Sequence, residues 1–131
     1  MPFAESPAVL VVDDNREITR MLSRNLGGAN VRVITAASGL ECFQALSATR
    51  IDLILLDIRL PDFNGWGILS LLRLTEPLCH IPVIMVSGEA PDPDLLRQLK
   101  PEYYIRKPFD MQDLLQRVEK IIDAREIGIC R

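Results

Sequence analysis

The chain has 131 residues, of which 48% are hydrophobic and 25% charged, as in one ordinary globular domain and unlike a disordered or fibrous protein. Its net charge is −3 and no run of five like charges occurs, which argues against electrostatic binding to nucleic acid or to an anionic membrane. The three cysteines are scattered without a CxxC spacing, which excludes a disulfide framework or a cysteine zinc site and is typical of a reducing compartment. The apolar runs are too short to span a membrane, and we expect no secretory signal because the first residues lack a basic start and an apolar stretch. We therefore expect one cytoplasmic domain.

Short apolar runs predict five strands. Three of them do not alternate with polar residues, which is typical of strands buried on both faces of a parallel sheet. These three runs cover residues 8–12, 53–56 and 82–86. A fourth run, 31–34, contains Arg32 and is expected nearer an edge, and a fifth, 103–105, is short and aromatic.

Segments with helical spacing of apolar residues lie between these runs. They cover residues 18–26, 38–48, 66–74, 92–99 and 111–122, and the segment 92–99 is the weakest because it is short and flanked by prolines. Gly27 and Gly28 end the first helix, Ser38 and Glu41 form a capping box, and Asp110 caps the last helix. A strand followed by a helix, five times over, predicts an α/β fold with helices on both faces of a parallel sheet. We expect the domain to cover residues 8–125, with a flexible flank at 1–7 and a tail or linker start at 126–131.

Polar residues follow the predicted strands at the point where each strand ends. Asp13 and Asp14 follow the first strand, Asp57 the third, Ser87 the fourth and Lys107 the fifth. The carboxyl ends of parallel strands form one rim, and ligands bind there where the strand order reverses. We therefore expect these five side chains to converge although they are far apart in sequence.

Three neighbouring carboxylates repel one another unless a cation neutralises them. Oxygen ligands with room for water suit Mg²⁺, which pairs with phosphate. A carboxylate beside Mg²⁺ and a lysine can act as nucleophile toward a phosphoryl group and give an aspartyl phosphate. The sequence therefore indicates a phosphoryl-transfer site at this rim.

Four motifs together resemble the receiver domain of two-component response regulators. They are Val11-Val12-Asp13-Asp14-Asn15, Leu55-Leu56-Asp57-Ile58-Arg59-Leu60-Pro61, Val86-Ser87-Gly88 and Arg106-Lys107-Pro108-Phe109. Each motif alone is weak evidence, but all four occur in the order and at the spacings of the family. The resemblance covers most of the chain. The resemblance implies a flavodoxin-like doubly wound sheet with strand order 2-1-3-4-5 and five helices.

The resemblance also implies a role for each acidic residue. Asp57 matches the phosphoacceptor, Asp14 the acid that contacts Mg²⁺ directly, and Asp13 the acid that acts through metal-bound water. The main-chain carbonyl of Arg59 matches the third protein contribution to the metal. The implied phosphoryl donor is a phosphohistidine of a sensor histidine kinase or phosphotransfer protein. A second copy of the chain or an output domain are further candidate partners, and no direct contact with nucleic acid or membrane is expected.

Three other residues complete the implied switch. Ser87 matches the hydroxyl that turns toward the phosphoryl group, and Lys107 the lysine that pairs with it. Tyr104 matches the aromatic residue that rotates inward from a solvent-facing rotamer and so changes the surface of the fourth helix, fifth strand and fifth helix. The peptide bond between Lys107 and Pro108 is expected to be cis.

Less specific interpretations remain for each residue. Asp13 and Asp14 could cap a helix, Ser87 could form a turn, Lys107 could be a solvated surface residue, and Tyr104 is as well explained as core packing. A dehalogenase-type phosphatase also uses an aspartyl phosphate, but that family needs Asp-x-Asp after its first strand. Here the candidate nucleophile stands in the sequence Asp57-Ile58-Arg59, which does not match. A receiver fold kept only as a binding module would be favoured by loss of an acid, the hydroxyl or the lysine, and none is lost.

Two charged residues flank the expected site. Arg59 lies two positions after the phosphoacceptor and Glu89 two after the hydroxyl, so their side chains could pair over the phosphoryl pocket and hinder water. The alternative is that both point into solvent. The sequence does not identify the cognate kinase, the output, the oligomeric state or the phosphoryl lifetime, nor whether the chain is part of a longer regulator.

Overall fold

The computed structural model describes residues 6–27 and 30–126. Within this part the chain alternates between strands and helices, as predicted. The strands are β1 (Ala8–Val12), β2 (Arg32–Ala36), β3 (Leu53–Leu56), β4 (Val83–Ser87) and β5 (Tyr103–Arg106). The helices are α1 (Arg16–Gly27), α2 (Gly39–Ala48), α3 (Gly65–Arg73), α4 (Pro93–Leu99) and α5 (Met111–Glu126), with a 3₁₀ turn η1 (Leu78–His80) between α3 and β4.

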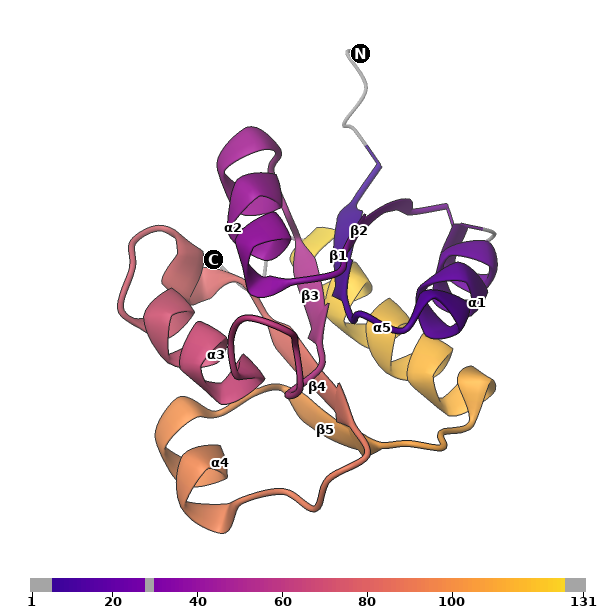
Figure 1. Ribbon diagram of the computed structural model, residues 1–131. Coiled ribbons are helices and arrows are strands. Elements are labelled where there is room, and N and C mark those ends of the chain that lie inside the picture. Colours follow the sequence, from indigo (N-terminus) through magenta and orange to yellow (C-terminus); the bar gives the residue numbers. More distant parts are fainter. Residues whose placement is uncertain (1–5, 28–29, 127–131) are drawn as a thin grey trace.

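The five strands form one parallel sheet in the order β2-β1-β3-β4-β5, which confirms the predicted doubly wound topology (Figure 1). From β1 the chain first moves outward to β2 and then returns to the other side of β1 for β3. The strand order therefore reverses between β1 and β3. β2 is an edge strand, as the charge of Arg32 indicated, although it begins one residue later and ends two residues later than predicted.

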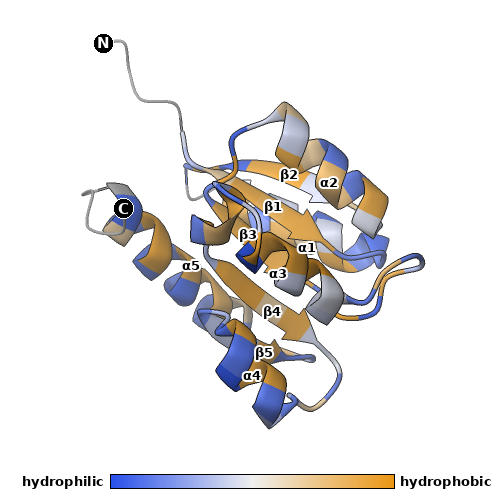
Figure 2. Ribbon diagram, turned by 90° about the vertical axis from the view of Figure 1, so that its left-hand side faces the viewer, coloured by the Kyte–Doolittle hydropathy of each residue, from blue (hydrophilic) through white to orange (hydrophobic). Residues whose placement is uncertain are grey.

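Two hydrophobic layers cover the sheet. Alternate residues of β1 point to opposite faces, so Leu10 packs under α2 and α3 whereas Val11 packs under α1 and α5. Figure 1 shows α1 and α5 on one side of the sheet and α2, α3 and α4 on the other. Figure 2 shows the apolar strands between helices whose outer surfaces are polar. Both faces of the central strands are thus buried, which explains their continuous Val, Ile and Leu runs.

Local capping fixes where the helices begin. The Ser38 hydroxyl accepts a hydrogen bond from the Glu41 N–H at 3.1 Å, and the Glu41 carboxylate accepts one from the Ala37 N–H at 2.8 Å. Asp110 accepts from the Gln112 N–H at 2.8 Å and so caps α5 as predicted. The weakest predicted helix is present as the seven residues of α4. The turn η1 was not predicted, because three residues show no periodicity.

The expected flanks fall mostly on residues 1–5 and 127–131, which lie outside the described residues. Ser6 and Pro7 are described, and their carbonyls accept hydrogen bonds from Arg32 at 3.2 and 2.8 Å. In the described part of the chain, no helix combines the length and the apolar character that crossing a membrane requires.

Candidate functional site

The reversal of strand order brings two acids together. Val12 and Leu56 are partners in neighbouring strands, so Asp13 and Asp57 leave the sheet side by side. The Asp57 N–H donates to the Val12 carbonyl at 3.0 Å, which continues the ladder past both strands. Asp13 is 4% exposed and Asp57 is 7% exposed. The exposed Asp14 completes a group of three carboxylates whose oxygen atoms lie within 4.8 Å of one another.

Lys107 lies between the two buried acids. Its Nζ donates to Asp13 Oδ2 at 2.7 Å and to Asp57 Oδ2 at 3.3 Å. The lysine is placed by its own N–H, which donates to the Ser87 carbonyl at 2.8 Å at the end of β4. The Lys107–Pro108 peptide bond is cis, as predicted. Sheet topology alone thus joins residues 94 positions apart.

The electrostatics of the site follow from burial and from these pairs. Burial raises the pKa of Asp57, the Asp13 charge raises it further, and Lys107 only partly offsets the two effects. For Lys107 burial lowers the pKa, but the hydrogen bond to Asp13 and the two carboxylate charges outweigh burial and hold the pKa above its usual value. The ammonium therefore stays charged, while the acids retain a repulsion that one lysine does not remove.

The donor set fits a magnesium ion. Three carboxylates offer hard oxygen atoms at one rim, and the exposed Asp14 leaves that side open to water. Asp57 Oδ1 already accepts the Ile58 N–H at 2.7 Å, which fixes the orientation of the carboxylate. The described residues thus supply both the charge and the ligand type that Mg²⁺ requires.

The hydroxyl and the aromatic residue adjoin this pocket. Ser87 is buried at the end of β4, and its Oγ accepts a hydrogen bond from the Glu89 N–H at 3.2 Å. Tyr104 is partly buried and packs against the core, whereas a solvent-facing rotamer was expected before phosphorylation. Its hydroxyl donates to the Glu89 carbonyl at 2.7 Å, and its ring stacks on Trp66 with centroids 5.9 Å apart. The apolar contact with Trp66 and the partly buried carbonyl acceptor both favour this position.

The loop after β3 lies close to the acid. A Cβ on Gly65 would lie 2.2 Å from the Asp57 carbonyl oxygen and 2.8 Å from the Ile58 Cα, so only glycine fits there. The Gly65 N–H donates to the Ile58 carbonyl at 2.7 Å. The sequence alone does not indicate this requirement for glycine, because the approach to the β3 end depends on tertiary structure.

Arg59 and Glu89 form an ion pair, which confirms the predicted approach of the two strand-end loops. The Arg59 side chain is 81% exposed and that of Glu89 is 39% exposed. Ile58 and Leu60 line the same surface depression as this pair. The arrangement places an exposed cation in the loop that follows β3 and Asp57.

An acidic, lysine-bridged pocket on a doubly wound sheet of order 2-1-3-4-5 defines the class of the protein. Residues 9–119 match the family model for the response regulator receiver domain, so the chain belongs to this family. The chain is a receiver domain, the signal-receiving module of two-component response regulators.

Known proteins support the assignment. Over 121 residues the chain is 30% identical to the transcriptional regulatory protein GltR of Pseudomonas aeruginosa, a match that covers 91% of this chain and 50% of GltR. It is 35% identical to the transcriptional regulatory protein CpxR of Escherichia coli K12, covering 87% of this chain and 48% of CpxR. A CheY-like receiver domain protein from Methanospirillum hungatei has the same fold, with a TM-score of 0.84, 28% identity, and coverage of 92% and 97% of the two chains.

The chain spans about half the length of the curated relatives it matches. Among them, RpaA of Synechocystis is described as a DNA-binding dual master transcriptional regulator. The expectation that nucleic acid is not a partner is therefore not supported by the relatives. Low basic charge in this span says nothing about other parts of a regulator.

Proposed function

We propose that this receiver domain accepts a phosphoryl group on the Asp57 carboxylate and acts as a signalling switch rather than as a turnover enzyme. The observation that carries the proposal is the Lys107 ammonium, which contacts both Asp13 and Asp57 inside a buried acidic pocket. A cation held there offsets charge on phosphoryl oxygens, which is the main requirement of phosphoryl transfer. A plain helix cap or turn would not bury two acids around one lysine.

Asp13, Asp14, Asp57 and the main-chain carbonyl of Arg59 are the groups that would hold Mg²⁺. When bound, the ion neutralises the carboxylates and the phosphoryl oxygens. The clustering of the three carboxylates supports this assignment, and the contribution of Arg59 is inferred from family resemblance.

The phosphoryl donor is a phosphohistidine of a sensor histidine kinase or of a phosphotransfer protein. An Asp57 oxygen forms a bond to phosphorus while the phosphorus–nitrogen bond breaks and its electron pair returns to the imidazole. Lys107 pairs with one phosphoryl oxygen, and the Ser87 hydroxyl leaves the Glu89 N–H to donate to another.

Movement of Ser87 alters the segment to which Tyr104 is bonded, because Ser87 and Tyr104 both contact the main chain of Glu89. The change passes to the surface formed by α4, β5 and α5, where an output domain or a second copy of the chain would bind. Coupling of this kind amounts to roughly 1–3 kcal/mol.

Incubation with acetyl phosphate and Mg²⁺, followed by intact-mass measurement, tests the proposal. We expect one phosphoryl adduct on the native chain, no adduct on Asp57→Asn, and a normal adduct on the control Asp123→Asn, which changes an exposed acid of α5. An adduct that survives in Asp57→Asn would overturn the assignment. Because the domain is expected to assist its own dephosphorylation at Asp57, slow phosphate release fits the switch, whereas hydrolysis of a phosphomonoester would favour the phosphatase alternative.

A further inference from the structure

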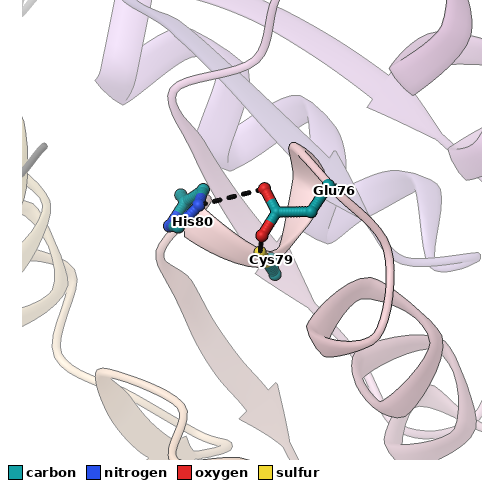
Figure 3. A group of neighbouring side chains, drawn as sticks. All are labelled: Glu76, Cys79 and His80. Atoms are coloured by element: carbon teal, nitrogen blue, oxygen red, sulfur yellow. Dashed lines mark hydrogen bonds and ion pairs between the residues drawn. The ribbon is translucent and has the colours of Figure 1, made fainter.

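A second cluster of metal-ligating side chains lies at the opposite rim of the sheet from Asp57. Glu76, Cys79 and His80 gather at the turn η1 (Figure 3), and one ligand atom from each lies within 4.8 Å of the others. The turn η1 leads into the amino end of β4, whereas Ser87 and the acidic pocket lie at its carboxyl end. The two clusters are therefore separated by the length of a strand.

The Glu76 carboxylate lies between the other two groups. Its Oε2 accepts a hydrogen bond from the Cys79 thiol at 3.1 Å, and its Oε1 lies 3.2 Å from His80 Nε2 (Figure 3). The Glu76 side chain is 76% exposed and that of His80 is 65% exposed, so an ion can reach both from solvent. Ligand atoms around a tetrahedral zinc ion lie roughly 3.3–3.8 Å from one another. Small side-chain rotations would give this spacing.

The backbone already holds these side chains on one face. Cys79 and His80 belong to η1 and Glu76 lies in the turn just before it, and the three side chains meet there. The Cys79 N–H donates to the Thr75 carbonyl at 2.8 Å, which closes the turn. Leu78 packs against the hydrophobic core and Ile81 is buried within it, so the turn is anchored on its inner side. An ion would find the ligands in place without folding a loop.

We propose that Glu76, Cys79 and His80 bind Zn²⁺ or a similar borderline divalent transition-metal ion, with solvent at the fourth position. A sulfur and an imidazole nitrogen favour such ions over Mg²⁺ and Ca²⁺, which prefer oxygen alone. On binding, the Cys79 thiol releases its proton to solvent as the sulfur–metal bond forms, and His80 binds through Nε2 with its proton on Nδ1. One thiolate and one carboxylate balance the double charge of the ion.

The scattered cysteines exclude a zinc site built on paired cysteines, whereas Cys79 here belongs to a mixed set of three ligand types. The site is also independent of the proposed phosphorylation, because it shares no residue with the acidic pocket.

Titration with Co²⁺, a spectroscopic substitute for Zn²⁺, tests the proposal. The titration uses the full chain carrying Cys130→Ser, which removes the thiol outside the described residues, and it includes excess Mg²⁺ to fill oxygen-only sites. We expect a thiolate-to-Co²⁺ charge-transfer band at one ion per chain that is displaced by Zn²⁺. The band should be lost in Cys79→Ser, and Co²⁺ affinity should fall at least about tenfold in His80→Ala and Glu76→Gln.

Asp57→Asn is the matched control and should keep the band unchanged. Circular dichroism of each variant verifies its fold, and two ligand variants besides Cys79→Ser keep the test decisive if one fails to fold. Absence of the band in the parent chain would overturn the proposal, and so would a band that persists in Cys79→Ser or disappears in Asp57→Asn.

Discussion

The Tyr104 hydroxyl donates a 2.7 Å hydrogen bond to the main-chain carbonyl of Glu89, which joins β5 to the loop after β4. The N–H of Glu89 donates a hydrogen bond to the Ser87 hydroxyl. Glu89 also pairs with Arg59 from the loop after β3. The segment around Glu89 thus connects the Ser87 hydroxyl, the Tyr104 ring and the ion pair with Arg59.

Tyr104→Phe should leave phosphorylation nearly intact while it loosens the loop after β4. The variant keeps the ring on Trp66 and removes only the hydrogen-bond donor, a loss of about 1 kcal/mol. Backbone amides of residues 88–90 should exchange hydrogen about fivefold faster, as mass spectrometry can measure. Tyr103→Phe, on the same strand, is the control. If Tyr104→Phe or Tyr104→Ala folds but is not phosphorylated, the role of Tyr104 as a switch is wrong.

Asp57→Asn should stabilise the fold at neutral pH in the absence of divalent cations. Burial and the Asp13 charge raise the pKa of Asp57 above the ordinary value of 3.8. The folded state therefore binds the proton more tightly than the unfolded state, so stability falls as pH rises from 3.8 toward the raised pKa. Above that window ionised Asp57 costs stability, and its removal should gain roughly 1 kcal/mol.

Urea unfolding at several pH values checks whether Asp57→Asn raises the free energy of unfolding. The gain should disappear below the ordinary aspartate pKa, where both states are protonated, and Mg²⁺ should stabilise the native chain more than the variant. Asp123→Asn should show neither effect. A destabilised Asp57→Asn at pH 7 would contradict the prediction.

Phosphorylation should depend on Mg²⁺. The Asp13, Asp14 and Asp57 carboxylates repel one another, and Lys107 supplies only one positive charge against three negative ones. Excess chelator should therefore abolish labelling by acetyl phosphate, and Asp14→Asn should require a higher Mg²⁺ concentration for half-maximal labelling. Robust labelling of the native chain in chelator would count against the metal site.

Replacing both Arg59 and Glu89 by alanine should shorten the lifetime of the phosphoryl group on Asp57. Hydrolysis needs a water in line with the phosphorus–oxygen bond, and the paired side chains hinder its approach. A barrier change of about 1.4 kcal/mol alters the lifetime tenfold. The exposed pair Asp94 and Arg97 on α4 offers a matched double-alanine control. A phosphoryl lifetime in Mg²⁺ that stays within about twofold of the native one would exclude the lid.

Gly65→Ala and Gly67→Ala should have opposite effects although both change α3. The new Cβ of Gly65→Ala would collide with the Asp57 and Ile58 backbone, which should cost about 1–3 kcal/mol and lower the phosphorylation rate. A Cβ at Gly67 meets nothing within 4 Å, so that variant should gain about 0.5–1 kcal/mol with unchanged labelling. Thermal unfolding compares the stability of the two variants, and intact-mass assays compare their labelling. Equal effects would refute the close approach of Gly65 to the Asp57 backbone.

The sequence by itself determined the elements and the rim on which the site lies. Unbroken apolar runs such as 53–56 specify strands buried on both faces, and Ser38 and Asp110 mark helix starts through their own side chains. Since parallel strands end on one rim, Asp13, Asp57 and Lys107 could be assigned to one site without coordinates.

Only the tertiary structure decided how side chains from different strands meet. The inward rotamer of Tyr104 depends on Trp66 and on the Glu89 carbonyl, and no local pattern encodes either contact. The unpredicted turn η1 lies between α3 and β4, and there Glu76 meets Cys79 and His80. Propensity and periodicity act over a few neighbouring residues, whereas packing and long-range hydrogen bonds select among rotamers that the sequence leaves nearly equal in energy.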